Sequence, residues 1–256
     1  MAGTALLSGA QATSQAALPS STAAAPAFPG RDTTSKFNPD GTRRAFAGNT
    51  VICHLPAQCA MRDVAAKFHQ AMAVSAFAGK LGLTSVDSYH MTVFPGANDQ
   101  NRTQSGWPSY VPIDESIEAC NTAVEERMRS ARLRCELPFR VQVDEAATLH
   151  YPRACTLRMK ALNEREEAKL RSVRDQLAVI YGFRLPDHAT YQFHVTLSYQ
   201  TATFSAAEQK DFDTLRAKYV SDIIAAQPVL ELGNPEFCTF PDMFRFEPKL
   251  LLSCVG

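Results

Sequence analysis

The chain has 256 residues, enough for one large domain or two fused lobes with a substantial core. Its 26 Lys and Arg side chains balance its 26 Asp and Glu side chains, so the formal net charge is zero. This balance argues against binding of long duplex nucleic acid, although it permits a local basic cleft for a short or terminal nucleotide. No apolar run approaches the roughly 20 residues that cross a membrane.

Residues 1–30 are rich in Ala, Ser, Thr, Gln and Pro, and no basic residue precedes Arg31. This composition lacks the basic start and long apolar run of a secretory signal, and it lacks the arginines of a mitochondrial one. We therefore expect a disordered leader over residues 1–35 and a single bilobal domain over residues 36–256. With no targeting signal, the default location is cytoplasmic.

The chain contains seven cysteines and no Cys-x-x-Cys pair. Most of them have apolar neighbours in the sequence, and their odd number argues against a fully paired disulfide framework. We expect reduced, buried thiols of the kind found in intracellular proteins.

The first half of the expected domain alternates strands and helices. Pro39 fixes φ and Asp40-Gly41 supplies a left-handed corner, which together predict a turn. We expect the strand that follows Asp87 to stop at Pro95. In chain order the patterns predict a turn at 37–42, a buried strand at 49–55, a helix at 57–80, a strand at 88–94, a polar loop at 97–112 and a helix at 113–133.

The second half continues in the same manner. Gly182 stands where the C-cap of a helix belongs, and Glu208 follows Ser205 at capping-box spacing. The patterns predict strands at 139–143 and 155–159 that form a hairpin, a helix at 161–181, a strand at 191–199, a helix at 205–226 and two closing strands within 229–252. This order is typical of an α+β fold, with helices covering one face of antiparallel sheets.

Two short strings in the chain match each other, His90-Met91-Thr92 and His194-Val195-Thr196. Residues i and i+2 of a β-strand project from the same face, so each histidine points to the same side as its threonine. The two histidines lie about 100 residues apart, close to the size of a small domain or lobe. We therefore expect two similar halves, each contributing one such strand to a cleft between them.

Two imidazoles that face each other across a cleft are suited to acid–base chemistry at a phosphate. Histidine titrates near pH ~6.5, so a pair can hold one neutral and one protonated member near neutrality. Each proton transfer contributes about 10²–10⁴-fold to the rate. The hydroxyls of Thr92 and Thr196 can donate hydrogen bonds to phosphate oxygens as charge builds. The sequence does not decide which histidine is the acid and which is the base.

The paired strings resemble the signature of the 2H phosphoesterase superfamily, which includes the 2′,3′-cyclic phosphodiesterases and the 2′-5′ RNA ligase-like proteins. The segments 37–41, 48–55, 89–94 and 237–240 are similar to a subgroup of that superfamily found in bacteria and fungi. The resemblance covers about residues 36–250. It implies a bilobal α+β fold of two pseudo-symmetric antiparallel sheets, flanked by helices, with both motifs in a central cleft.

The resemblance also implies metal-independent hydrolysis of a 2′,3′-cyclic or related ribose phosphodiester. His90 and His194 are then the acid–base pair, and Thr92 and Thr196 bind the substrate phosphate. The expected partner is a small nucleotide or an RNA end, with no cofactor, no metal and no membrane. The sequence leaves the oligomeric state open.

Further residues are candidates for substrate contacts. Trp107 and Tyr110 lie in the loop after the first motif and are free to reach a ligand. Tyr199 lies five residues after His194, an odd offset that aims it at the opposite face of an ideal strand. Arg158 or Arg153 can supply positive charge to a phosphate.

Other interpretations of these residues remain open. The main rival is a non-catalytic module that uses the same cleft to bind a nucleotide or RNA. A metal site at His90 and His194 lacks a carboxylate or cysteine at ligand spacing. His54 follows a buried strand and is expected to be a structural histidine. Nothing near Cys53 or Cys155 in the sequence would activate a thiol nucleophile.

Overall fold

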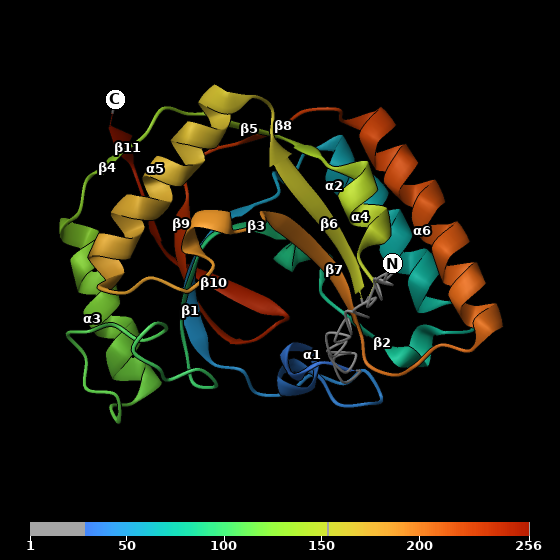
Figure 1. The fold of residues 1–256 in the computed structure, drawn as a ribbon, viewed down its shortest axis with the longest axis horizontal. Helices are drawn as coiled ribbons and strands as arrows, with labels where there is room; N and C mark the ends of the chain where they lie inside the picture. The colour runs from blue at the N-terminus through green and yellow to red at the C-terminus, as the bar shows by residue number, and fades with distance from the viewer. Residues whose placement is uncertain (1–28, 153, 256) are drawn as a thin grey trace, which may run out of the picture.

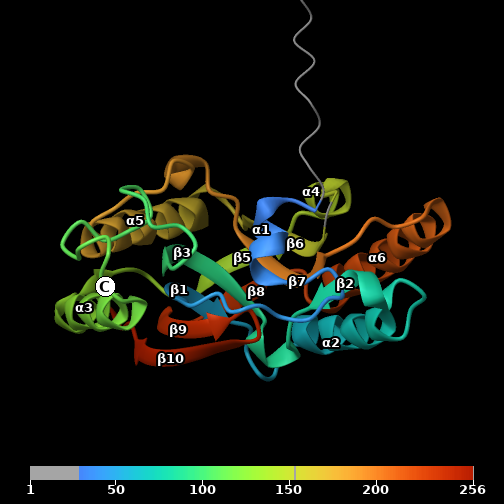
Figure 2. The same cartoon turned by 90° about the horizontal axis from the view of Figure 1, so that it is seen from below.

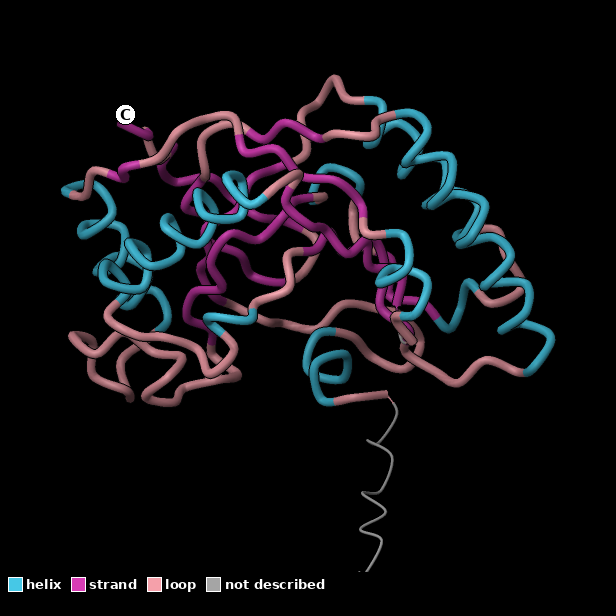
Figure 3. Tube along the Cα trace, turned by 45° about the horizontal axis from the view of Figure 1, so that its top comes forward, coloured by secondary structure: helices cyan, strands magenta, loops and turns pink. Residues whose placement is uncertain are grey.

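The computed structural model describes residues 29–152 and 154–255. Two antiparallel sheets occupy its centre and helices cover them from outside, which confirms the α+β expectation (Figures 1 and 3). Helices α3 (Ile117–Ser130) and α5 (Glu164–Tyr181) lie on one side in Figure 1. Helices α2 (Ala60–Ala73) and α6 (Ala206–Ala226) pack against each other on the other side.

The first sheet carries the first histidine motif on an edge strand. Its order is β10-β9-β1-β3, and every neighbouring pair is antiparallel. The central strand β1 is buried over all but its last residue, which matches the apolar run that predicted it. The strands are β1 (Gly48–His54), β3 (His90–Asn98), β9 (Glu236–Asp242) and β10 (Arg245–Leu251).

The second sheet carries the second motif and has the order β2-β7-β6-β5-β8, again antiparallel throughout. The predicted pairing of the two strands around residues 139–161 is confirmed, with helix α4 (Glu145–His150) in the connection. The strands are β2 (Leu81–Leu83), β5 (Phe139–Val143), β6 (Ala154–Ala161), β7 (His194–Gln200) and β8 (Leu230–Leu232).

The turn and helix boundaries follow the chemistry read from the sequence. Gly41 and Gly182 both adopt positive φ, at 81° and 73°, where a side chain would be strained. Ser205 and Glu208 form the expected reciprocal capping box at the start of α6. Within the described residues, no helix combines the length and apolar character that a membrane crossing needs.

Both motif strands contain a β-bulge directly after the motif threonine. In β3, Thr92 pairs with Ile52 and Phe94 pairs with Val51, so Val93 has no partner on β1. In β7, Thr196 pairs with Thr156 and Ser198 with Cys155, so Leu197 is skipped in the same way. A bulge inserts one extra residue and re-aims the side chains that follow it.

The first bulge explains why β3 does not stop at Pro95, contrary to the expectation. The strand continues to Asn98, with Pro95 opposite Thr50 on β1. Proline is tolerated in a strand at an edge or beside a bulge, where its missing N–H is not needed, and β3 offers both.

Ordered structure begins earlier than expected. Residues Arg31–Lys36, assigned to the leader up to residue 35, form the short helix α1. Figure 2 shows α1 between β3 of the first sheet and β6 of the second. Residues 1–28 of the expected leader lie outside the described residues, as does Arg153.

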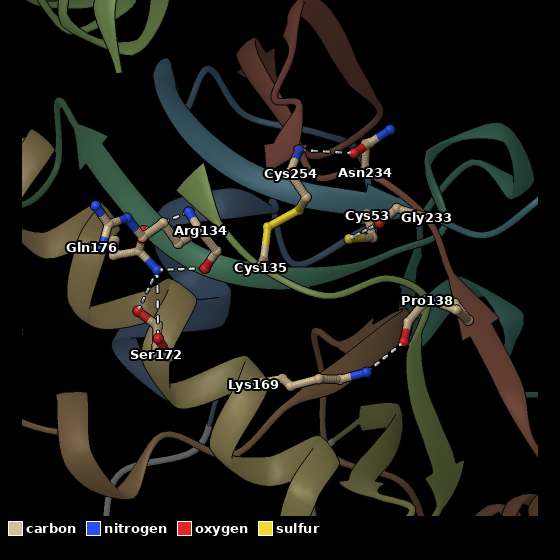
Figure 4. The surroundings of a disulfide bond; sticks show 10 residues. All are labelled: Cys53, Arg134, Cys135, Pro138, Lys169, Ser172, Gln176, Gly233, Asn234 and Cys254. Atoms are coloured by element: carbon tan, nitrogen blue, oxygen red, sulfur yellow. Dashed lines mark hydrogen bonds between the residues drawn. A yellow bond between two sulfur atoms is a disulfide. The ribbon is translucent and has the colours of Figure 1, made fainter. Parts of the chain in front are cut away.

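The expectation that all cysteines are reduced is wrong for two of them. Cys135 and Cys254 form a disulfide with a Cα–Cα distance of 5.0 Å (Figure 4). Two short strands, β4 (Leu133–Arg134) and β11 (Cys254–Val255), pair in parallel and bring these cysteines together. The other five cysteines are free and buried, as expected.

Candidate active site

One cavity of about 440 Å³ contains both motifs. His90 and Thr92 reach it from β3, and His194 and Thr196 reach it from β7. The two strands contact each other across the junction of the sheets. The structure therefore brings together four residues that the sequence places on two distant strands.

Each of the two histidines is held by a hydrogen bond of the same kind. Nδ1 of His90 lies 2.6 Å from the carbonyl oxygen of Ser88, and Nδ1 of His194 lies 2.8 Å from that of Gln192. A carbonyl oxygen can only accept, so Nδ1 carries the proton and donates it in both rings. This assigns the proton of the neutral ring to Nδ1 and leaves Nε2 as the nitrogen that can exchange a proton.

The strands that pair with β3 and β7 also place similar residues beside the two motif histidines. His54 of β1 lies directly opposite His90, and Arg158 of β6 lies directly opposite His194. Each motif strand thus pairs with a strand that places one nitrogen-bearing side chain beside the motif histidine. Arg158 lines the cavity, with its guanidinium carbon 4.0 Å from the centre of the Tyr151 ring.

The bulge in β7 brings Tyr199 into the cavity, although its odd offset from His194 predicts the opposite face. The skipped residue Leu197 shifts the alternation by one position, so Tyr199 rejoins the face that carries Thr196. The bulge in β3 has the same effect on Pro95, which lies three residues after Thr92 and also lines the cavity.

The surroundings of both motif histidines favour their neutral form. Burial is the main cause that lowers the pKa of His90, to about 3, and the neighbouring His54 and His194 add to the shift. Burial also lowers the pKa of His194, helped by the positive charges of Arg158 and Lys36. The carbonyl oxygens that accept from Nδ1 act in the opposite direction but do not compensate.

Lys36 of helix α1 brings a second cation to the cavity. Its Nζ lies 3.4 Å from the hydroxyl oxygen of Tyr199 and 2.6 Å from Oδ1 of Asp32. Burial works to lower the pKa of Lys36, but Tyr199 and Asp32 together outweigh it and raise that pKa. Lys36 therefore stays charged in a largely enclosed position.

An apolar wall completes the cavity. Phe240 comes from β9 and Phe246 from β10, and their ring centres lie 5.0 Å apart. The Phe246 ring lies 4.3 Å from the His90 ring, so this wall adjoins the motif histidine. Phe46 and Met243 extend it. Such a surface suits a flat ligand group that stacks on aromatic faces.

The structure does not bring Trp107 and Tyr110 to the cavity. Trp107 is buried, and its indole N–H donates to the carbonyl of Pro112 within the same loop. The Tyr110 hydroxyl donates to the carbonyl of Ile180, and the Arg127 guanidinium lies 3.8 Å from its ring. Tyr110 thus links the loop to α3 and α5, whereas Trp107 holds the loop to itself.

The sequence reasoning missed Lys36, Tyr191 and the apolar wall. Tyr191 lies three residues before His194, and its hydroxyl interacts with the Thr92 side chain from the other sheet. The phenylalanines between 237 and 246 were a visible signal, used only to predict strands. Lys36 gave no local signal, because only the fold places α1 over the cavity.

Two antiparallel sheets that each supply a histidine and a threonine to one cavity are the arrangement expected of 2H phosphoesterases. A family model described as 2H-phosphodiest, a domain of unknown function (DUF1868), matches residues 36–151, which include the first motif. Over these residues the chain is similar to the 2H phosphoesterases. The second motif lies beyond the matched residues, and the structure joins it to the first.

The fold is also similar to a solved structure. The crystal structure of a conserved protein of unknown function from Agrobacterium tumefaciens strain C58 matches with a TM-score of 0.76 and 27% sequence identity. The match covers 87% of this chain and 93% of that one. Comparison with curated proteins finds no match.

Proposed function

We propose that this cavity hydrolyses a 2′,3′-cyclic or related ribose phosphodiester on a nucleotide or an RNA end. The observation that carries the proposal is the matched pair of histidines, each with Nδ1 fixed by a carbonyl oxygen, in one cavity with two threonine hydroxyls. The cavity volume of about 440 Å³ lies within the range typical of small-molecule sites. The match of residues 36–151 to the 2H-phosphodiest family model supports the same class of reaction.

In the proposed reaction, one neutral imidazole takes a proton at Nε2 from the water that attacks phosphorus. The other imidazole, protonated, gives its Nε2 proton to the ribose oxygen that leaves. One P–O bond forms and one breaks, so the product is a phosphomonoester beside a free ribose hydroxyl. Thr92 and Thr196 donate hydrogen bonds to the non-bridging oxygens as negative charge builds on them.

The substrate itself helps to charge the acid. Burial lowers the pKa values of both histidines and so favours their neutral forms. A bound phosphodiester brings a negative charge, which favours the protonated form of the nearer ring. Lys36 and Arg158 add positive charge that attracts the anion into the cavity.

The apolar wall is the proposed site for the base. Phe240 and Phe246 present aromatic faces next to His90, so a base stacked there would leave its ribose phosphate near both motifs. Stacking on aromatic side chains tolerates any base, since every base has a π-face.

The experiment is hydrolysis of 2′,3′-cyclic nucleotides and cyclic-phosphate-ended oligonucleotides in the presence of EDTA. We expect turnover by the wild type and a loss of about 10²–10⁴-fold in His90→Ala and in His194→Ala. His150→Ala is the matched control, because His150 is exposed at the end of α4 and is not among the residues that line the cavity. The product formed also identifies which phosphodiester bond opens.

Two outcomes would reject the proposal. Activity abolished by EDTA in the wild type would rule out a reaction carried by the chain's own groups. No turnover on any substrate, combined with tight binding of the same nucleotides, would favour the non-catalytic binding module.

A further inference from the structure

Three side chains with different donor atoms gather near the His90 end of the cavity. They are His54, Glu236 and Cys238, and their donor atoms all lie within 4.8 Å of one another. Nδ1 of His54 lies 2.9 Å from Oε2 of Glu236. None of the three is among the described residues that line the cavity. The ring centres of His54 and His90 are 6.1 Å apart, so this cluster is a neighbour of the catalytic site and separate from it.

The backbone places these side chains together. Glu236 and Cys238 are alternate residues of β9 and therefore project from one face of the first sheet. They pair with Ile52 and Thr50 of β1, and His54 continues the same face of that strand. The cluster therefore rests on two hydrogen-bonded strands, which hold metal ligands more rigidly than a loop does.

We propose that His54, Glu236 and Cys238 bind a single Zn²⁺ or a similar borderline divalent cation. Imidazole nitrogen, carboxylate oxygen and thiolate sulfur are the three donors that zinc accepts, and a water molecule completes the tetrahedron. The thiolate argues against Mg²⁺ and Ca²⁺, which prefer oxygen ligands only.

Two features around the cluster support this assignment. The nearby Cys53 thiol is not included among the ligands, because it donates a hydrogen bond to the carbonyl oxygen of Gly233 (Figure 4). The His54 and Glu236 side chains are 21% and 22% exposed, which gives an ion a path into the cluster.

The test is a titration of the chelator-stripped full-length protein with Co²⁺, used as a spectroscopic substitute for Zn²⁺. We expect a near-ultraviolet charge-transfer band from thiolate to cobalt. Cys238→Ser should abolish the band. Cys120→Ser should keep it, because that matched control removes another buried free thiol, on α3. Circular dichroism of each variant checks that it is folded.

The two partly exposed ligands provide a second test that does not depend on changing a buried residue. His54→Gln and Glu236→Gln should each weaken Zn²⁺ binding, measured by competition with a chelating dye, by about tenfold or more. The proposal is overturned if the wild type binds no Co²⁺, if the band survives in Cys238→Ser, or if both glutamine variants bind Zn²⁺ as tightly as the wild type. These readouts are binding measurements, so they stand apart from the proposed phosphodiesterase activity.

Discussion

Arg174 of α5 donates a hydrogen bond from Nη1 to the carbonyl oxygen of Val93, at 2.6 Å. Val93 is the bulged residue directly after Thr92. Arg174 is fully buried, its Nη2 donates to the carbonyl of His188, and its guanidinium carbon lies 4.0 Å from the centre of the Tyr191 ring. A buried cation thus ties the first bulge to the segment that leads into the second motif.

Replacing this cation should weaken both the fold and the site. Arg174→Met leaves two buried carbonyl oxygens without a donor, so we expect the free energy of unfolding to fall by about 2–4 kcal/mol. We also expect kcat/KM to fall roughly tenfold, because the bulge that aims Thr92 loses its anchor. Urea unfolding and steady-state kinetics measure the two effects. Arg165→Gln, an exposed change on the same helix, is the control and should alter neither.

The pH dependence of activity follows from the two lowered histidine pKa values. The proposed reaction needs one protonated and one neutral imidazole, and the pKa values of both histidines lie below the usual value of 6.5. The bell-shaped profile of kcat/KM should therefore reach its maximum below pH 6.5 and fall above it. If kcat/KM, measured over a full pH series, reached its maximum above pH 7, the two histidine pKa values could not both be lowered by burial.

The same burial makes stability depend on pH. His90 has a pKa of about 3 when folded and 6.5 as its ordinary value, so below pH 6.5 the unfolded chain binds a proton that the folded chain does not. Its contribution to stability is complete above pH 6.5 and is lost as the pH falls towards 3. We expect the urea midpoint to drop between pH 6.5 and 5, above the ordinary range of carboxylates.

His90→Gln separates this effect from general acid sensitivity. The variant should show a smaller drop in its urea midpoint over the same interval, because glutamine does not titrate. His150→Gln, at an exposed position, should behave as the wild type. An identical drop in all three proteins would show that His90 is not the group responsible.

The sequence was sufficient for the strands that carry the motifs, because alternation and apolar runs act locally. It also predicted the helix ends at Gly182 and Ser205, where one residue decides the backbone conformation. The two bulges were not predictable from the same patterns. Val93 and Leu197 are ordinary strand residues, and only pairing with β1 and β6 shows that each is skipped.

The remaining errors concern contacts that local sequence patterns do not reveal. Cys135 and Cys254 are 119 residues apart, and only the pairing of β4 with β11 joins them. Trp107 was expected at the ligand, but its indole N–H is satisfied within its own loop. Local patterns carry no information about which distant surface a loop residue will meet.

Lys36 is the clearest case of a site residue that only the fold reveals, and it supports the last prediction. Its Nζ lies between Asp32 and Tyr199 in the cavity, where an incoming phosphate can take over the place of the exposed carboxylate. Hydrogen bonds to charged groups contribute about 1.5–3 kcal/mol, so we expect Lys36→Met to lower kcat/KM about 10–100-fold. The loss should appear mainly as a higher KM if Lys36 binds the substrate and the transition state equally.

Two further variants decide whether the charge of Lys36 or its packing is responsible. Lys36→Arg keeps the charge and should recover part of the activity, whereas a purely structural role would leave it as impaired as Lys36→Met. Lys67→Met removes an exposed lysine of α2 and should leave KM unchanged. If Lys36→Met retains the wild-type kcat/KM, then α1 only covers the cavity and Arg158 alone supplies the positive charge.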